Sequence, residues 1–172
     1  MNHININFEI EKAKKFKKTG NVEEAKKVYE NIILNYPKNT RVLNALENLN
    51  KDNFKLNYDK AIELYHQKRY NEAFDLAENL LKNNPESSSL LNLLGGISLA
   101  IEDFISAKFY FKACISANPN FVHSYNNLGL ILKSIGKLDD AHKSFNKAIK
   151  IKPKYASAHY NFTILKKFEA KD

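Results

Sequence analysis

A pattern of small, aromatic and proline residues recurs along this chain with a period of about 34 residues. A period of this length fits one unit of supersecondary structure, which has to stack on its neighbours to bury its apolar face. The residues that carry the recurrence are Gly95, Ala107, Phe111, Pro119, Gly129, Ala141, Phe145, Ala148 and Pro153. The sequence therefore predicts an array of similar units.

The copy from Tyr125 to Pro153 shows the unit most clearly. Its apolar residues are spaced i, i+3, i+4, i+7 in the first part and i, i+4, i+7 in the second, so each part places one apolar stripe on a helix. Gly136 lies between the stripes and can adopt the left-handed conformation that ends a helix. Pro153 cannot continue the second helix. Each unit is therefore predicted to be a hairpin of two helices.

The other copies are less regular towards the N-terminus. The hairpin over residues 6–37 keeps the turn glycine Gly20 and the closing Pro37, but its first helix lacks the aromatic residue and the glycine. An end unit packs on one side only and tolerates such losses. We predict a degenerate hairpin with an extra helix over residues 1–52, and a regular region over 53–172 with repeats at 54–87, 88–121 and 122–155 and a capping helix at 156–172.

The register of the repeat is interrupted before the regular region. The closing prolines Pro37 and Pro85 are separated by more than one period and less than two, whereas Pro85 and Pro119 are one period apart. A short amphipathic helix is predicted over 40–49, no second helix follows it, and a new first helix is expected to begin near Asn53. We therefore expect a joint or an altered twist between residues 51 and 54.

The hairpin resembles the tetratricopeptide repeat, which carries an aromatic residue, Leu-Gly, a turn glycine, Ala, Phe, Ala and Pro at these offsets. The chain departs from the family in having no tryptophan, with Leu91, Tyr125 and His159 where the family often has one. The resemblance implies an all-α fold, a right-handed superhelix (alpha solenoid) of antiparallel helical hairpins with a C-terminal capping helix. It also implies that the first helices line the concave surface.

The resemblance places a peptide-binding site on the first helices. Asn127 and Asn161 are one period apart, and an asparagine amide offers both a donor and an acceptor to an extended backbone. Such a ladder is similar to the one that holds peptides in O-linked N-acetylglucosamine transferase. Changing both asparagines to alanine is expected to abolish peptide capture and leave melting nearly unchanged. The candidate concave residues are Tyr58, Asn92, His123, Asn126, Asn127, Leu130, Lys133, Tyr160 and Asn161.

A second mode of the family is not expected in this chain. Tetratricopeptide domains that hold the acidic C-termini of heat-shock chaperones clamp the terminal carboxylate with Lys, Arg and Asn. Asn127 matches one of these positions. The other positions hold Asn92, Gly96, Ser157 and Asn161, none of which is cationic. We therefore predict that the carboxylate clamp is absent.

Catalysis has no support in the sequence. The histidines are scattered, without the i, i+4 spacing that places two metal ligands on one helix face: His3, His66, His123, His142 and His159. Cys114 occupies a small-residue packing position and is expected to be a buried space-filler. Gly95-Gly96 lacks the strand and the further glycines of a phosphate loop. We predict no catalytic residue, no metal and no cofactor.

The charge and hydropathy of the chain bear on its partners and its compartment. The net charge is +8, but the lysines are spread over the outer faces of the predicted hairpins and form no concentrated stripe, which disfavours nucleic-acid binding. No apolar run approaches the roughly 20 residues of a membrane span, and the N-terminus lacks a signal-peptide core. The single cysteine agrees with a reducing compartment. We expect a cytoplasmic protein.

These observations predict a non-catalytic interaction module that binds a peptide segment of a partner protein in its concave groove. Three alternatives stay open. The chain could be the N-terminal region of a longer glycosyltransferase or sulfotransferase, because arrays resembling this one precede such domains. It could self-associate into a homo-oligomer through the ends of its hairpins. It could also be an RNA-binding helical repeat.

Overall fold

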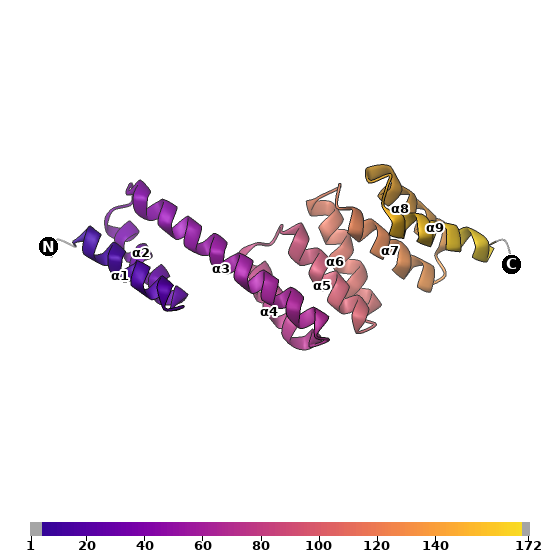
Figure 1. Ribbon diagram of the computed structural model, residues 1–172. Coiled ribbons are helices and arrows are strands. Elements are labelled where there is room, and N and C mark those ends of the chain that lie inside the picture. The colour runs from indigo at the N-terminus through magenta and orange to yellow at the C-terminus, as the bar shows by residue number, and fades with distance from the viewer. Residues whose placement is uncertain (1–4, 170–172) are drawn as a thin grey trace. The chain divides into compact units, whose positions relative to one another are not determined.

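The computed structural model describes residues 5–169, and in this range every regular element is a helix (Figure 1). The helices are α1 (Ile6–Lys18), α2 (Val22–Asn35), α3 (Thr40–His66), α4 (Tyr70–Asn83), α5 (Ser88–Ala100), α6 (Phe104–Ala117), α7 (Val122–Ser134), α8 (Leu138–Ile151) and α9 (Ala156–Glu169). Their contacts form two compact units, Met1–Asn57 and Tyr58–Asp172. The predicted fold of helical hairpins with a C-terminal helix is confirmed. The domain boundary at residues 52 and 53 stays a prediction.

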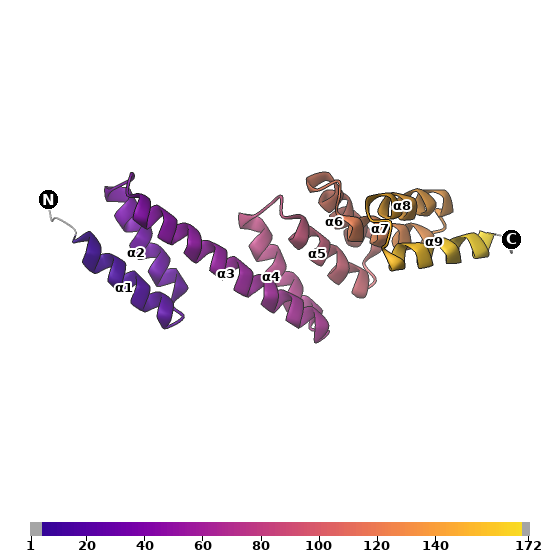
Figure 2. The ribbon, with the colours of Figure 1, turned by 45° about the horizontal axis from the view of Figure 1, so that its top comes forward.

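The second unit is a row of antiparallel hairpins. The second half of α3 runs alongside α4 in both views, α5 packs on α6, and α7 packs on α8 (Figures 1 and 2). Neighbouring hairpins meet through α4 with α5 and α6 with α7, and α9 packs on α8 and α7. The helix α9 therefore covers the last hairpin, as expected of a cap. The last three residues of the predicted cap, 170–172, lie outside the described residues.

In two of the hairpins, a glycine of the first helix packs against a phenylalanine of the second helix where the two helices cross. A Cβ atom on Gly129 would lie 2.6 Å from Cε1 of Phe145, and one on Gly95 would lie 2.7 Å from Cε1 of Phe111. Both phenylalanines are fully buried. Each ring thus lies on the glycine of its own hairpin, and both rings also belong to a cluster that continues through Leu128. The glycines are needed because any larger side chain would displace the ring.

The hairpin of α3 and α4 fills the same register positions differently. Ala61 stands one period before Gly95, and Ala77 stands one period before Phe111. Both alanines have no exposed surface. Two alanine methyl groups, one on each helix, therefore take the place of the glycine and phenylalanine found in the next hairpin. This hairpin is the least regular of the three in sequence, yet its buried positions follow the same plan.

The turn between the two helices of a hairpin takes the left-handed conformation in every hairpin. The φ angles are 79° at Gly20, 61° at Lys68, 62° at Glu102 and 74° at Gly136. Gly20 and Gly136 confirm the predicted turn glycines. At Lys68 and Glu102 a side chain adopts a backbone conformation that costs L-residues about 1 to 2 kcal/mol. The position in the repeat dictates the backbone, whether or not glycine occupies it.

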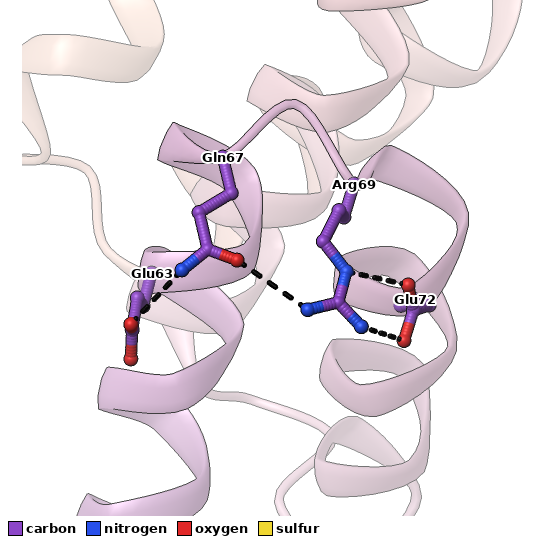
Figure 3. Close-up of polar contacts among 4 residues, drawn as sticks. All are labelled: Glu63, Gln67, Arg69 and Glu72. Carbon is purple, nitrogen blue, oxygen red and sulfur yellow. Dashed lines mark hydrogen bonds and ion pairs between the residues drawn. The ribbon is translucent and has the colours of Figure 1, made fainter.

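Polar contacts bridge the turn from α3 to α4 (Figure 3). Arg69 donates from Nε and Nη2 to the two carboxylate oxygens of Glu72, at 2.7 and 2.6 Å, and from Nη1 to Gln67 at 3.4 Å. Gln67 donates to Glu63 at 3.0 Å. All four side chains are exposed, so each contact contributes little to stability. The contacts therefore accompany the left-handed turn at Lys68, which recurs at the same position in the other hairpins.

The expected joint before the second unit is wrong, because α3 is one helix of 27 residues through residues 51–54. No glycine or proline occurs between Thr40 and His66, so no residue ends the helix at the place where the repeat changes register. Residues 40–57 of α3 belong to the first unit, and residues 58–66 belong to the second. Each repeat normally has a first and a second helix. In α3 the first helices of two repeats are joined directly, and the second helix that would separate them is missing.

The first unit has a core of its own. Its buried cluster joins α1, α2 and the first half of α3, and consists of Ile10, Ala13, Ala25, Tyr29, Ile32, Val42 and Leu49. The densest lysine cluster lies on the outside of this unit, where Lys12 pairs with Glu9, Lys14 with Glu11 and Lys17 with Asp52. These exposed pairs offset part of the positive charge there.

Candidate functional site

A surface hollow of about 520 Å³ lies between α7 and α9. It is lined by Asn126, Leu130, Ala156, Ser157, Tyr160 and Asn161. Four of these residues are among the predicted concave residues. The repeat places both helices in the same role, so side chains one repeat apart meet across the hollow. The structure thus brings part of the predicted peptide-binding face together.

A chain of asparagine amides includes Asn126 and Asn161, which line the hollow, and continues to Asn127, which does not. Asn161 donates from Nδ2 to Oδ1 of Asn126 at 2.9 Å, and Asn126 donates from Nδ2 to Oδ1 of Asn127 at 3.4 Å. Asn126 is only 4% exposed, whereas Asn127 and Asn161 are half-buried. Asn126 therefore links α7 to α9 as part of the fold. The amide donors of Asn127 and the Oδ1 of Asn161 keep hydrogen-bonding capacity for a ligand.

The lining of the hollow is also partly apolar. Tyr160, which is 68% exposed, and the half-buried Leu130 both line it. A tyrosine of this exposure presents a large apolar surface with a hydroxyl at its tip, which suits contact with a partner in water. The hollow therefore combines polar groups that can pair with a backbone and an apolar surface that can hold a side chain.

The other predicted site residues lie outside this hollow. Tyr58 on α3 is half-buried, and burial raises the pKa of its hydroxyl while a hydrogen bond with Ser89 acts against the rise. Asn92 on α5 accepts a hydrogen bond of 3.0 Å from Ser124. Lys133 is half-buried near the end of α7. Asn92 thus contributes to the contact between two hairpins.

His123 lies at the exposed start of α7. Its Nδ1 is 3.0 Å from the hydroxyl of Tyr155, and the two ring centres are 5.2 Å apart. Tyr155 precedes α9, so this contact ties the start of α7 to the loop before the cap. The hydrogen bonds of Ser124 with Asn92 and of His123 with Tyr155 could not be predicted from the sequence. Each depends on single polar atoms, whereas the periodicity of the sequence reports only apolar residues.

Residues with catalytic potential have structural partners. The thiol of Cys114 is buried and donates to the carbonyl oxygen of Ser88 at 3.1 Å, and burial raises its pKa. His159 lies with Nε2 2.7 Å from the carbonyl oxygen of Pro153. His3 lies outside the described residues. Over residues 5–169, no three His, Cys, Asp or Glu side chains gather as metal ligands, and no helix is long and apolar enough to cross a membrane.

Protein-family models of the tetratricopeptide repeat match four stretches of the chain. The matched residues are 12–39, 88–121, 110–143 and 129–162. Together they fall in both compact units. The first match lies over α1 and α2, so the degenerate hairpin carries the same repeat as the regular ones.

Curated proteins with sequence similarity include peroxisomal targeting signal receptors. The receptor of Kluyveromyces lactis is 31% identical over 71 residues, and that of Eremothecium gossypii is 30% identical over 71 residues. Each match covers 41% of this chain and 12% of the relative. The chain therefore matches about an eighth of the length of these receptors.

Several solved structures share the fold. The first tetratricopeptide domain of Spaghetti (RPAP3), bound to the HSP90 peptide SRMEEVD, gives a TM-score of 0.64 at 17% identity and covers 68% of this chain and 93% of its own. The O-GlcNAc transferase of Thermobaculum terrenum gives 0.62 at 20% identity, with 65% and 22% covered. The MamA protein gives 0.58 at 19% identity, with 96% and 82% covered.

Proposed function

We propose that this chain, which belongs to the tetratricopeptide repeat family, is a non-catalytic module that binds an extended segment of another protein across α7 and α9. The observation that carries the proposal is the hollow of about 520 Å³ between these helices, whose lining includes the amides of Asn126 and Asn161 together with the exposed Tyr160. An extended peptide presents backbone donors and acceptors together with alternating side chains, and this surface offers partners for both.

The proposed site recognises the segment through hydrogen bonds to its backbone and through apolar contact with one of its side chains. The free amide capacity of Asn127 and Asn161 pairs with the backbone of the segment, at about 0.5 to 1.5 kcal/mol for each hydrogen bond. Tyr160 and Leu130 hold an apolar side chain. Backbone pairing does not select a sequence, so the selection of one partner over another depends on the side chain held at Tyr160.

Relatives of the chain support a peptide as the ligand. The similar domain of Spaghetti (RPAP3) is bound to a peptide of HSP90, and the receptors of similar sequence are named for a targeting signal. The ligand proposed for this chain is not held by its terminal carboxylate, because Asn92, Gly96 and Ser157 provide no cation. The proposed compartment is the cytoplasm, in agreement with a single cysteine that is a free thiol.

A site-specific crosslink tests the proposal directly. A photoreactive phenylalanine analogue replaces Tyr160 in the cell, and mass spectrometry identifies the segments that become attached. Phe8 on α1 provides a matched control position, since it is 66% exposed and Tyr160 is 68% exposed. We expect linear segments of one or a few proteins at Tyr160 and none of these at Phe8. Identical crosslinks at both positions would contradict a site between α7 and α9.

The captured segment then serves as the ligand for variants. Tyr160→Ala and Asn127→Ala are each expected to weaken binding by about tenfold, which corresponds to about 1.4 kcal/mol. Phe8→Ala serves as the control and should bind as the unchanged chain does. Unchanged affinity in the first two variants, with helical content intact, would exclude this site as the place where the segment binds.

A further inference from the structure

A second pocket of about 410 Å³ lies in the second unit where α4, the end of α5 and the start of α6 meet. Its walls carry two aromatic rings, Tyr70 and Phe74, and two carboxylates, Asp75 and Asp103. Ser98 of α5 also lines it. None of these residues takes part in the hollow between α7 and α9. The pocket is therefore a separate feature of the molecule.

Ser98 is an exception within the repeat. It is 1% exposed, and its hydroxyl has no hydrogen-bond partner among residues 5–169. The same register position holds Leu64 one repeat earlier and Leu132 one repeat later, and both leucines are buried. Serine is smaller than leucine, so it leaves space at this junction and also brings a polar atom to it. Buried polar groups without a partner are rare in folded proteins and call for an explanation.

The pocket is acidic in a chain with a net charge of +8. Asp75 forms no ion pair within the described part of the chain, and Asp103 accepts a hydrogen bond of 3.0 Å from the backbone N–H of Ser106. One repeat later the corresponding residues are Phe109 and Lys137. The junction of α4, α5 and α6 is therefore acidic, whereas the equivalent junction one repeat later is not. The carboxylates thus depart from the repeat in the same place as Ser98.

The aromatic and acidic groups lie close to each other. The rings of Phe74 and Tyr110 are 6.1 Å apart between centres, at an angle of 69°. Tyr110 lies behind Phe74 and does not line the pocket; burial raises its pKa, and the negative charges of Glu78 and Asp103 raise it further. A group that enters the pocket would therefore meet aromatic faces and negative charge together.

We propose that this pocket binds the cationic head of a lysine or arginine side chain from a partner protein. The faces of Tyr70 and Phe74 attract a cation through their quadrupoles, and Asp75 and Asp103 supply the opposite charge. The N–H groups of an ammonium or guanidinium are donors only, and Ser98 Oγ is an acceptor without a partner in residues 5–169. The aliphatic stem of such a side chain can lie along Ile101, as long cationic side chains do on apolar surfaces.

Titration with small probes tests the charge requirement. The probes are N-acetyl-lysine methylamide, N-acetyl-arginine methylamide and the uncharged norleucine analogue, added to the full chain and followed by amide chemical shifts in NMR. We expect saturable shifts around Asn71, Ser98 and Ile101, with at least one cationic probe bound about tenfold more tightly than the norleucine probe. Equal shifts with all three probes, or none near these residues, would overturn the proposal.

Charge-neutral variants locate the binding groups. Asp75→Asn and Asp103→Asn are each expected to weaken the cationic probe by about tenfold. Asparagine caps a helix as well as aspartate does, so Asp103→Asn keeps the start of α6 intact. Asp139→Asn, an exposed change in the first turn of α8, is the matched control and should have no effect. Equal weakening in the control would assign the effect to net charge and contradict a specific pocket.

Ser98 offers a test that separates binding from structure. Ser98→Leu restores the residue of the neighbouring repeats, so we expect a higher melting temperature together with loss of probe binding. Ser98→Ala removes the oxygen with little change in volume, and should weaken the cationic probe severalfold without lowering the melting temperature. If both variants bind the probe as the unchanged chain does, Ser98 and its pocket play no part in recognition.

Discussion

The hairpins α5–α6 and α7–α8 are two versions of one structure. Both place a buried phenylalanine ring on a glycine, and both pass through a left-handed turn. They differ in that Glu102 occupies the turn of one and Gly136 the turn of the other. They also differ at Ser98 and Leu132, two equivalent buried positions. The shared contacts define the hairpin, and the differences show which positions can change while the hairpin keeps its structure.

This comparison teaches that a repeat supplies its own reference for each residue. A serine in a core is not unusual in itself, but a serine between two equivalent leucines indicates that a requirement other than packing acts at that position. Substitutions at the ring, at the Ser98 position, at the asparagine link and at the turn test this comparison.

The largest effect is expected at the buried ring. Phe145→Ala should lower the free energy of unfolding by about 3 to 5 kcal/mol, because it leaves a cavity at the crossing of α7 and α8. Adding Gly129→Ala recreates the pair of alanines found at Ala61 and Ala77, and should recover part of that loss. Urea unfolding followed by circular dichroism measures both variants. A double variant less stable than Phe145→Ala would show that the two pairs are not equivalent solutions.

The exchange of Leu132 for serine comes next. Leu132→Ser in α7 should cost about 2 to 4 kcal/mol, through the lost burial of a large side chain and a hydroxyl with no partner. The reverse change, Ser98→Leu, should stabilise the hairpin of α5 and α6. Thermal unfolding of the two variants provides the comparison. Opposite signs are expected, and a loss of stability in both would mean that Ser98 is already the best residue for its surroundings.

A smaller cost is expected at the link between α7 and α9. Asn161→Ala should destabilise the chain by about 1 to 3 kcal/mol, because it leaves Oδ1 of the buried Asn126 without its donor. Asn127→Ala should cost less, since the hydrogen bond that it removes is 3.4 Å long. Differential scanning calorimetry of both variants gives the ranking. The reverse ranking would contradict the structural role assigned to Asn126.

The smallest effect, and a favourable one, is expected at the turn. Glu102→Gly should stabilise the hairpin of α5 and α6 by about 0.5 to 1 kcal/mol, because glycine adopts a positive φ without strain. Gly136→Ala should act in the opposite direction by about 1 kcal/mol. Melting temperatures of the two variants test this. A destabilised Glu102→Gly would mean that the side chain makes a compensating contact.

The sequence predicted the parts of this fold that follow from contacts inside one repeat. The apolar stripes and the turn glycine Gly136 predict the hairpin of α7 and α8, and the structure contains that hairpin. The repeat period predicts a new helix near Asn53, whereas α3 continues through this point because no glycine or proline occurs there to end it. A period cannot show whether two helices are joined, whereas the residues between them can.

The candidate site was predicted only in outline. Asn126, Asn161, Leu130 and Tyr160 were placed on the inner face and do gather around one hollow. The hydrogen bond between Asn126 and Asn161 was not predicted, because the two residues lie on different helices and their pairing depends on side-chain direction. The expectation that loss of the Asn161 amide would leave melting nearly unchanged therefore no longer holds. The pocket at Ser98 required knowledge of which polar atoms lack partners.

The continuous helix α3 also determines where a protease would divide the chain. No residue from Asn50 to Lys60 is buried, and this stretch contains Lys51, Lys55 and Lys60. The boundary between the two compact units falls within the same stretch. A helix segment without buried side chains opens more readily than one that is packed in a core. Trypsin should therefore cut α3 first in its middle and release two fragments, each of which retains its own buried cluster.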